Sequence, residues 1–153
     1  MKERTLIIIK PDGIQRQLAG RIMSRLEQKG FKLVAAKFVH ISEELARKLY
    51  SVHEGQSFLE GLVRFIISSP CLVTVWEAEG IIEMARKMMG ATFGPNAEPG
   101  TIRGDFGSSN RFNLVHGSDS PESAKREIDL FFMPDEIINY ELSDFHWIYG
   151  TKD

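Results

Sequence analysis

The sequence has few of the residues that cross-link small proteins, and it lacks the long apolar runs of membrane proteins. Its single cysteine, Cys71, cannot form an internal disulfide, and no Cys/His cluster has the spacing of a zinc site. The early apolar run from Leu6 to Ile9 is too short for a signal-peptide core, and no stretch approaches a membrane span. We therefore expect a cytoplasmic protein in a reducing compartment, with no membrane partner.

An excess of charge of one sign is also missing. The chain has 19 Lys and Arg against 21 Asp and Glu, and these residues are interspersed, for a formal net charge of −2. A dedicated nucleic-acid binder needs a concentrated basic face, so nucleic acid is not the main partner that we expect. The glycine-rich phosphate loops Gly-x-x-x-x-Gly-Lys-Ser/Thr and Gly-x-Gly-x-x-Gly are absent too. Phosphate chemistry would have to use individually placed side chains.

The length of 153 residues predicts one domain, residues 1–153. β-Branched and apolar patterning predicts four strands, at 6–9, 32–39, 72–76 and 112–115. Apolar residues at helical spacing, with Ser42, Ser120 and Pro121 as start signals, predict helices at 14–29, 42–52, 58–66, 81–89 and 121–132.

This alternation of strands and helices predicts an α+β fold. We expect a ferredoxin-like sandwich, in which helices cover one face of a four-stranded antiparallel sheet. Residues 91–110 are rich in Gly, Pro, Asn and Ser and predict a long inserted loop, which in a compact domain is usually functional. Periodicity alone leaves a flavodoxin-like three-layer sheet as an alternative.

One segment carries most of the functional information. His116 stands at the end of a predicted strand, before Gly117 and a helix capped by Ser120. A histidine held there can act as a phosphate-accepting nucleophile if a second group fixes its ring. Glu127 lies on the flank of the core-facing stripe of that helix, from which it can reach back toward the strand. From position alone, a structural histidine and a solvated glutamate are the commoner interpretations.

The same segment resembles a known family. The run His116-Gly117-Ser118-Asp119-Ser120, with Ser-Ala and Glu-Ile following, is similar to the active-site stretch of the nucleoside diphosphate kinases. The segments Ile8 to Gly13 and Pro99 to Phe106 resemble two further landmarks of that family, in the expected order. The resemblance implies a ferredoxin-like fold and ping-pong transfer of a γ-phosphoryl group from a nucleoside triphosphate to a diphosphate. It also implies Mg²⁺ bound with the nucleotide and a homo-hexamer, or in some members a tetramer.

The resemblance also assigns roles to residues. It implies a pros-phosphohistidine at His116, with a catalytic group that further comprises Glu127, Ser118, Lys10 and Tyr50. It implies nucleotide binding by Lys10, Phe58, Arg86, Thr92, Arg103 and Asn113, and an Asp119 near the magnesium through water. From the sequence alone, core packing is an almost equally good interpretation of Phe58.

Two departures and two rival functions accompany this interpretation. Asn110 stands where the family often has an apolar side chain against the base, and Phe93 follows Thr92 where many members have Thr-Asn-Pro. A regulatory or nucleic-acid-binding protein on the same scaffold, or a member whose acceptor is a protein histidine, are the alternatives. The aromatic stretch from Phe145 to Tyr149 suggests an interface.

Overall fold

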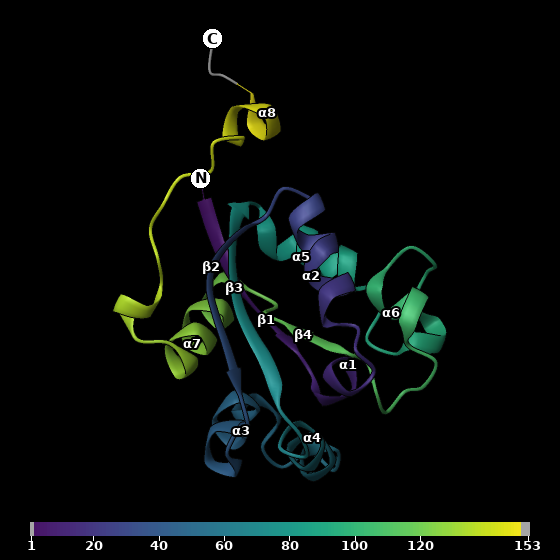
Figure 1. The fold of residues 1–153 in the computed structure, drawn as a ribbon. Helices are drawn as coiled ribbons and strands as arrows, with labels where there is room; N and C mark the ends of the chain where they lie inside the picture. The colour runs from purple at the N-terminus through teal and green to yellow at the C-terminus, as the bar shows by residue number, and fades with distance from the viewer. Residues whose placement is uncertain (1, 151–153) are drawn as a thin grey trace.

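The computed structural model describes residues 2–150 and is built around one four-stranded sheet, in the order β2-β3-β1-β4 (Figure 1). The strands are β1 (Lys2–Ile9), β2 (Lys32–Val39), β3 (Cys71–Glu79) and β4 (Val115–Gly117). All three strand pairings are antiparallel. The predicted α+β sandwich is confirmed, and the flavodoxin-like alternative, which needs a parallel sheet, is wrong.

Helices cover both faces of this sheet, so the prediction of helices on one face alone is wrong (Figure 1). One face packs against α2 and α5, and the other against α3, α4 and α7. The helices are α1 (Pro11–Gln15), α2 (Ala19–Gln28), α3 (Glu43–Leu49), α4 (Leu59–Ile66), α5 (Ile81–Met89), α6 (Ile102–Phe106), α7 (Pro121–Phe131) and α8 (Phe145–Tyr149).

Strand β1 is central because its apolar run serves both faces. Leu6 and Ile8 belong to the core cluster beneath α3, α4 and α7, whereas Ile7 belongs to the cluster beneath α2 and α5. All four residues from Leu6 to Ile9 are fully buried. Successive strand side chains point to opposite faces, so a continuous apolar run suits a strand that is covered on both.

Several predicted boundaries are wrong. The strands predicted at 6–9 and 72–76 are longer, Lys2–Ile9 and Cys71–Glu79. The predicted helix 14–29 is two helices, because Gln17 has a φ of 58° between α1 and α2. The predicted strand 112–115 is displaced to Val115–Gly117, because the backbone turns at Leu114. The loop 91–110 is partly ordered into a short 3₁₀ turn and the helix α6, which Thr101 caps by accepting the Gly104 N–H.

The C-terminal segment crosses the end of the sheet near the start of β1. The Ile138 N–H donates to the Val34 carbonyl at 2.9 Å, and the Lys2 ammonium lies 5.1 Å from the Phe145 ring centroid. Helix α8 stands at the top of the view in Figure 1, away from the rest of the helices. No helix within residues 2–150 has the length and apolarity to cross a membrane.

Candidate active site

His116 lies in the middle of the short edge strand β4, not at a strand end as predicted. It is paired in register with Ile8 of β1. Residues directly opposite each other in an antiparallel pair share a face of the sheet. Ile8 packs in the cluster that includes Ile128 and Phe131 of α7. His116 therefore faces α7, and the fold itself brings that helix within its reach.

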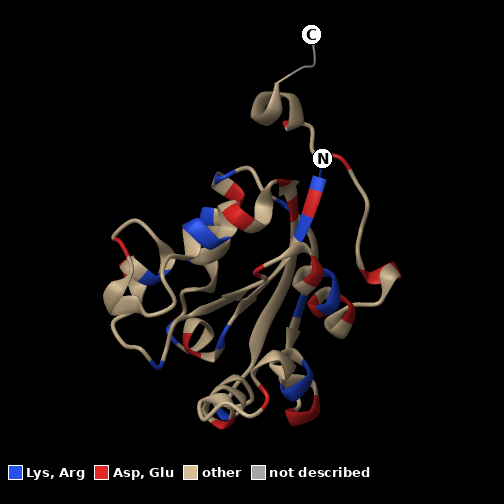
Figure 2. Ribbon diagram, turned by 180° about the vertical axis from the view of Figure 1, so that it is seen from behind, with Lys and Arg blue, Asp and Glu red and all other residues tan. Residues whose placement is uncertain are grey.

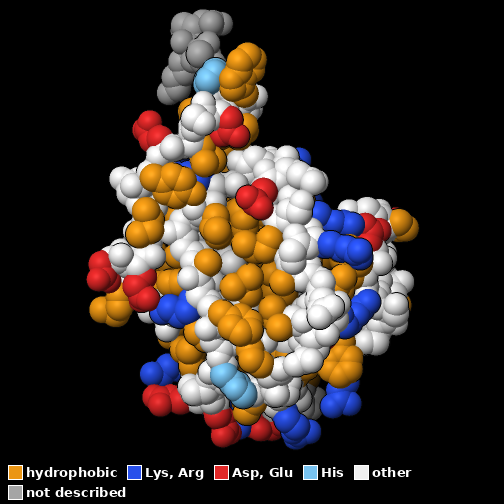
Figure 3. Space-filling model, viewed as in Figure 1, with side chains coloured by type: hydrophobic (Ala, Val, Ile, Leu, Met, Phe, Trp, Pro, Cys, Tyr) orange, Lys and Arg blue, Asp and Glu red, His pale blue; other side chains and the backbone are white. Residues whose placement is uncertain are grey.

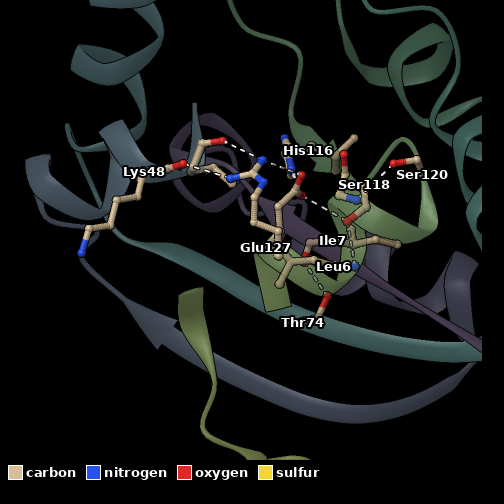
Figure 4. Close-up of polar contacts among 12 residues, drawn as sticks. Leu6, Ile7, Lys48, Thr74, His116, Ser118, Ser120 and Glu127 are labelled. Carbon is tan, nitrogen blue, oxygen red and sulfur yellow. Dashed lines mark hydrogen bonds and ion pairs between the residues drawn. The ribbon is translucent and has the colours of Figure 1, made fainter. Parts of the chain in front are cut away.

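Glu127 of α7 meets the histidine from this face (Figure 4). Its Oε1 lies 2.6 Å from Nε2 of His116 and accepts the Ser118 hydroxyl at 3.1 Å. The Ser118 Oγ in turn accepts the Leu6 N–H at 3.3 Å. Glu127 is 4% exposed, so the interpretation of a solvated helix acid is wrong. The carboxylate is therefore held by His116 of β4 and by Ser118 directly after β4, and β1 in turn fixes Ser118.

This contact determines which ring nitrogen of His116 carries the free lone pair. An ionised carboxylate can only accept hydrogen bonds, so the proton between the two groups belongs to Nε2 of His116. In a neutral imidazole the other nitrogen, Nδ1, then carries the lone pair. A carboxylate that accepts from one ring nitrogen orients the ring and stabilises positive charge on it while the other nitrogen reacts.

A row of rings leads from His116 toward the surface. The Tyr50 ring lies edge-on to His116 with centroids 6.3 Å apart, and His53 follows at 6.2 Å from Tyr50. Phe58 packs edge-on to His53 at 5.1 Å and is 50% exposed, so core packing of Phe58 is wrong. The Tyr50 hydroxyl is buried and has no hydrogen-bond partner within residues 2–150. Burial raises the pKa of this hydroxyl above its usual range.

Lys10 lies at the end of β1, where its ammonium is fixed. It is 5% exposed and donates to Oδ1 of Asn113 at 2.8 Å. The Asn113 amide donates to the Thr92 carbonyl at 3.1 Å, so three predicted residues form one chain of contacts. Burial and the nearby Arg103 guanidinium lower the pKa of Lys10 to about 8, and the Asp12 carboxylate partly opposes that shift.

Three backbone carbonyls fix the position of the Arg103 guanidinium. Its guanidinium donates to the carbonyls of Gly90, Asn113 and Val115 at 3.0, 3.1 and 2.7 Å. An arginine has five N–H donors, so two remain for a ligand. Burial and the nearby Arg86 lower the pKa of Arg103 to about 10. Arg103 therefore holds the backbone around the site and places positive charge there.

Arg86 and Asp119 line one cavity together with Gly90 and Thr101. A hydrogen bond from Ser123 lowers the pKa of Asp119, which keeps that carboxylate charged. No group of three or more His, Cys, Asp and Glu side chains within residues 2–150 could hold a metal ion. A single carboxylate nevertheless fits magnesium that arrives on a nucleotide, since Mg²⁺ keeps several waters and binds mainly to the phosphates.

The structure thus brings all of the predicted site residues into one region. Sequence reasoning missed two contributors. His53 joins Tyr50 to Phe58, and nothing in its local sequence indicates this. Asp12, for which the sequence predicted no role, accepts the Leu114 N–H at 3.1 Å; its position two residues after Lys10 in the Lys-Pro-Asp-Gly segment was the available signal.

Comparison with protein families gives one match. A family model described as "Nucleoside diphosphate kinase" matches residues 3–137. A nucleoside diphosphate kinase of Carboxydothermus hydrogenoformans is 54% identical over 147 residues, which are 96% of this chain and 99% of the relative. One of Halalkalibacterium halodurans is 53% identical over 146 residues, which are 95% of this chain and 99% of the relative.

Solved structures agree with the sequence relatives. The nucleoside diphosphate kinase of Halobacterium salinarum in complex with CDP has a TM-score of 0.95 at 46% identity, covering 97% of this chain and 99% of its own. A transition state mimic of the Borrelia burgdorferi enzyme with bound vanadate and ADP has a TM-score of 0.91 at 38% identity, covering 98% of both chains. The ferredoxin-like architecture is therefore shared by proteins that bind nucleotides.

Proposed function

This chain belongs to the nucleoside diphosphate kinase family, and from that premise we propose that it transfers the γ-phosphoryl group between nucleotides through Nδ1 of His116. As a member of the family it is a phosphotransferase. The observation that carries the proposal is the 2.6 Å contact between Nε2 of His116 and Glu127. That contact assigns the proton to one ring nitrogen and the nucleophilic lone pair to the other.

The reaction has two half-reactions at one site. In the first, the lone pair of Nδ1 attacks the γ-phosphorus of a nucleoside triphosphate, the bond to the bridging oxygen breaks, and the diphosphate leaves with that electron pair. The imidazole becomes positive as it attacks, and Glu127 stabilises this charge through Nε2. In the second, an oxygen of another diphosphate takes the phosphoryl group from Nδ1. Ping-pong kinetics follow because a covalent intermediate separates the two substrates.

Four side chains are proposed to hold the phosphates. Lys10, Arg86 and Arg103 supply positive charge, and Thr92 lies beside them through the contact of its carbonyl with Asn113. Fixed donors that face a transferring phosphoryl group stabilise its charge and align the reacting atoms. Burial of Lys10 and Arg103 supports this role, because a buried cation gains more from a phosphate than an exposed one does.

Three further residues are proposed to contact the nucleoside or the reacting group. Phe58 presents a half-exposed ring on which a base can stack, and Asn113 lies beside Lys10 for the ribose hydroxyls. The unpartnered Tyr50 hydroxyl, next to the His116 ring, supports a role as donor to the reacting group. A base that stacks on a ring makes no specific hydrogen bonds through its edge, so we expect the site to accept nucleotides with different bases.

Magnesium is proposed to arrive with the nucleotide. Asp119 would hold it through water, while the phosphates supply most of its ligands. When bound, the ion offsets phosphate charge and favours in-line displacement. The residues of this chain bind and orient the nucleotide around it.

We propose that residues 1–153 form one cytoplasmic domain that assembles into a homo-hexamer, with a tetramer as the alternative. Apolar side chains gather on the face over β2 and β3 in Figure 3. Phe38 of β2 and, in the segment after α7, Met133 and Ile138 are more than half exposed, and Trp147 of the tail is 82% exposed. Exposed apolar surface of this kind is typical of a subunit interface. Sedimentation velocity would count the subunits.

No observation favours the rival functions. Basic and acidic residues lie on the same helices in Figure 2, and the formal net charge of the chain is −2, whereas nucleic-acid binding favours a clustered excess of Lys and Arg. A protein histidine as acceptor would still require the phosphohistidine. Comparing diphosphates with candidate proteins as acceptors separates that alternative from nucleotide exchange.

One experiment tests the proposed function directly. Incubation with ATP and Mg²⁺ alone should give a stoichiometric, acid-labile phosphohistidine and release ADP, and later addition of another diphosphate should discharge it. The His116→Ala variant should show no labelling. Equal labelling of His116→Ala would overturn the assignment, and labelling that no diphosphate can discharge would overturn the choice of acceptor.

A further inference from the structure

The backbone turns sharply at Leu114, between the site residues Asn113 and His116. Leu114 has a φ of 71°, in the left-handed region. The Val115 N–H donates to the Asn113 carbonyl at 2.7 Å across it. A hydrogen bond from residue i+2 to residue i around a positive φ is the rare, strained form of the γ-turn. Leucine gains nothing locally from this conformation, so its neighbours must hold it.

Both backbone polar groups of Leu114 bind the segment that follows β1. The Leu114 carbonyl accepts the Lys10 N–H at 2.8 Å. The Leu114 N–H donates to Oδ2 of Asp12 at 3.1 Å. Two partners that lie about a hundred residues away in the chain therefore hold the strained residue from both of its peptide groups.

The flanks of the turn are held from the other direction. Arg103 donates to the carbonyl of Asn113 on one side of Leu114 and to that of Val115 on the other. The Leu114 side chain is fully buried in a cluster with Ile102 and Val115. These contacts hold the residues on either side of Leu114 and its side chain. The N–H of Leu114 itself is held by the Asp12 carboxylate.

We propose that Asp12 is a positioning residue for phosphoryl transfer, which holds the strained turn at Leu114 and so fixes Asn113 and His116 relative to each other. The proposal rests on the proposed function of His116. Asn113 binds the Lys10 ammonium before the turn, and His116 follows two residues after it. A change of the turn would move the phosphate-binding side relative to the nucleophile, and a misplacement near 1 Å can cost about 100-fold in rate.

A second observation supports the role of the Asp12 carboxylate. Its other oxygen, Oδ1, is buried and has no hydrogen-bond partner within residues 2–150. Burial raises the pKa of this carboxyl group, so the charged form is held at a cost. Part of that cost is offset by the nearby Lys10 ammonium and by the charge-assisted bond that Oδ2 accepts from the Leu114 N–H.

The competing explanation is a general helix effect. Asp12 lies in the first turn of α1, where an acidic side chain interacts favourably with free N–H groups. In that case its loss would change stability but not the rate of folded molecules. The two explanations therefore differ in the rate of the chemical step, measured at saturating nucleotide on folded protein.

Three substitutions of Asp12 separate the effect of its position relative to the Leu114 N–H from the effect of its charge. Asp12→Asn keeps a carbonyl oxygen at the same distance, so it can still accept the Leu114 N–H although it is neutral. Asp12→Glu keeps the charge but moves the carboxylate by one methylene. Asp12→Ala removes the acceptor. Glu3→Ala is the matched control, because Glu3 also accepts a distant backbone N–H, that of Ile82 at 2.9 Å, at the far end of β1.

The experiment measures single-turnover phosphorylation of His116 by saturating ATP and Mg²⁺ in the full chain, below the onset of unfolding. We expect Asp12→Ala to be about 100-fold slower and Asp12→Glu about tenfold slower, with Asp12→Asn and Glu3→Ala within about threefold of the parent. Amide hydrogen exchange at Leu114 and Val115 should be faster in Asp12→Ala and Asp12→Glu than in Asp12→Asn.

Several results would overturn the proposal. They are an Asp12→Ala rate within threefold of the parent, an Asp12→Asn rate no better than that of Asp12→Glu, or an equal loss in Glu3→Ala. If Asp12→Ala does not fold, the comparison of Asp12→Asn with Asp12→Glu decides alone. A parent that forms no phosphohistidine would overturn the proposed function instead, and the exchange rates would still decide whether Asp12 holds the turn.

Discussion

Two regions of this molecule reverse the usual distribution of residues. The region around His116 buries charged side chains, and the outer surface exposes apolar ones. Around His116 the charged side chains of Lys10, Arg103 and Glu127 are 5%, 8% and 4% exposed. On the edge strand β2 and in the tail, the apolar side chains of Phe38 and Trp147 are 63% and 82% exposed. Charged residues are almost never fully buried unless they are paired, and large apolar patches rarely face water in monomers.

The difference shows two ways in which a fold keeps groups ready for a partner. The buried charges are held by partners that do not fully neutralise them: Lys10 by an amide, and Arg103 by three carbonyls. They retain positive charge in a region of low dielectric, where an incoming phosphate gains most from it. The exposed apolar groups would gain by association with another subunit in the proposed homo-oligomer.

The largest effect is expected where the buried charge of Glu127 contacts the proposed nucleophile, His116. Glu127→Ala should slow phosphorylation of His116 by ATP about 100- to 1000-fold, because the Nε2 proton loses its acceptor and the imidazole its orientation. Rapid-quench measurement of the labelled intermediate gives the rate. Ser118→Ala, which removes only the second bond to the carboxylate, should cost less, about tenfold. A rate for Glu127→Ala within tenfold of the parent would contradict the assigned role.

Lys10 should make activity and stability respond to pH in opposite directions. Burial lowers its pKa from 10.5 to about 8, so between these values the unfolded chain binds the proton more strongly than the folded one. Its contribution to the free energy of unfolding therefore rises with pH across this window, by about 3 kcal/mol in all. Over the same window kcat/KM should fall, since the proposed phosphate site loses the positive charge of Lys10.

The matched variant for this prediction is Lys10→Met. It removes the titrating group but keeps an apolar stem of similar length, so the parent should gain stability relative to Lys10→Met as pH rises from 8 to 10.5. Urea unfolding of both proteins at several pH values measures the difference. The titration of Tyr50 cancels between them, because Lys10 is not among the groups that shift the Tyr50 pKa. A difference that stays constant with pH would show that Lys10 has an ordinary pKa.

The sequence predicts the strands and helices of the apolar core better than the polar contacts of the site. The strand 32–39 and the helix 81–89 match the structure, because each rests on its own periodicity. The helix 14–29 fails at Gln17, since the four-residue apolar spacing continues across a residue whose φ is 58°. Periodicity records which side chains are buried and is blind to a single backbone reversal.

The polar contacts depend on residues that are distant in the chain. The local sequence around Glu127 is typical of a solvated helix acid. Its burial depends on β1 and β4, which the sequence of α7 does not indicate. The strand 112–115 is displaced because Leu114 takes a conformation that leucine rarely adopts, and Lys10 and Asp12 hold it from outside the segment. The family resemblance supplied the candidate site residues, but only the assembled fold shows which side chains and backbone groups each of them contacts.

Phe58 sharpens the comparison, because it is an exposed apolar side chain inside the site. If its ring stacks on a base, Phe58→Ala should raise KM about tenfold with little change in kcat, since base stacking contributes about 1–3 kcal/mol. The rise should be similar for purine and pyrimidine diphosphates. Phe65→Ala is the control, because Phe65 on the same helix packs against Phe112 instead. A loss in kcat alone would place Phe58 outside the base site.

The smallest effect within one subunit is expected on the apolar surface. Phe38 is 63% exposed on the edge strand, so Phe38→Asp should change the unfolding free energy of a dilute, dissociated subunit by no more than about 0.5 kcal/mol. In the assembly the same change buries a charge without a partner, so sedimentation velocity at micromolar concentration should show smaller species than the parent forms. Glu44→Asp, at an exposed site on α3, controls for a change in an acidic side chain that leaves the edge strand untouched. If the parent and the variant sediment alike, the exposed apolar residues of β2 do not take part in assembly. Only the buried charges around His116 would then have a functional explanation.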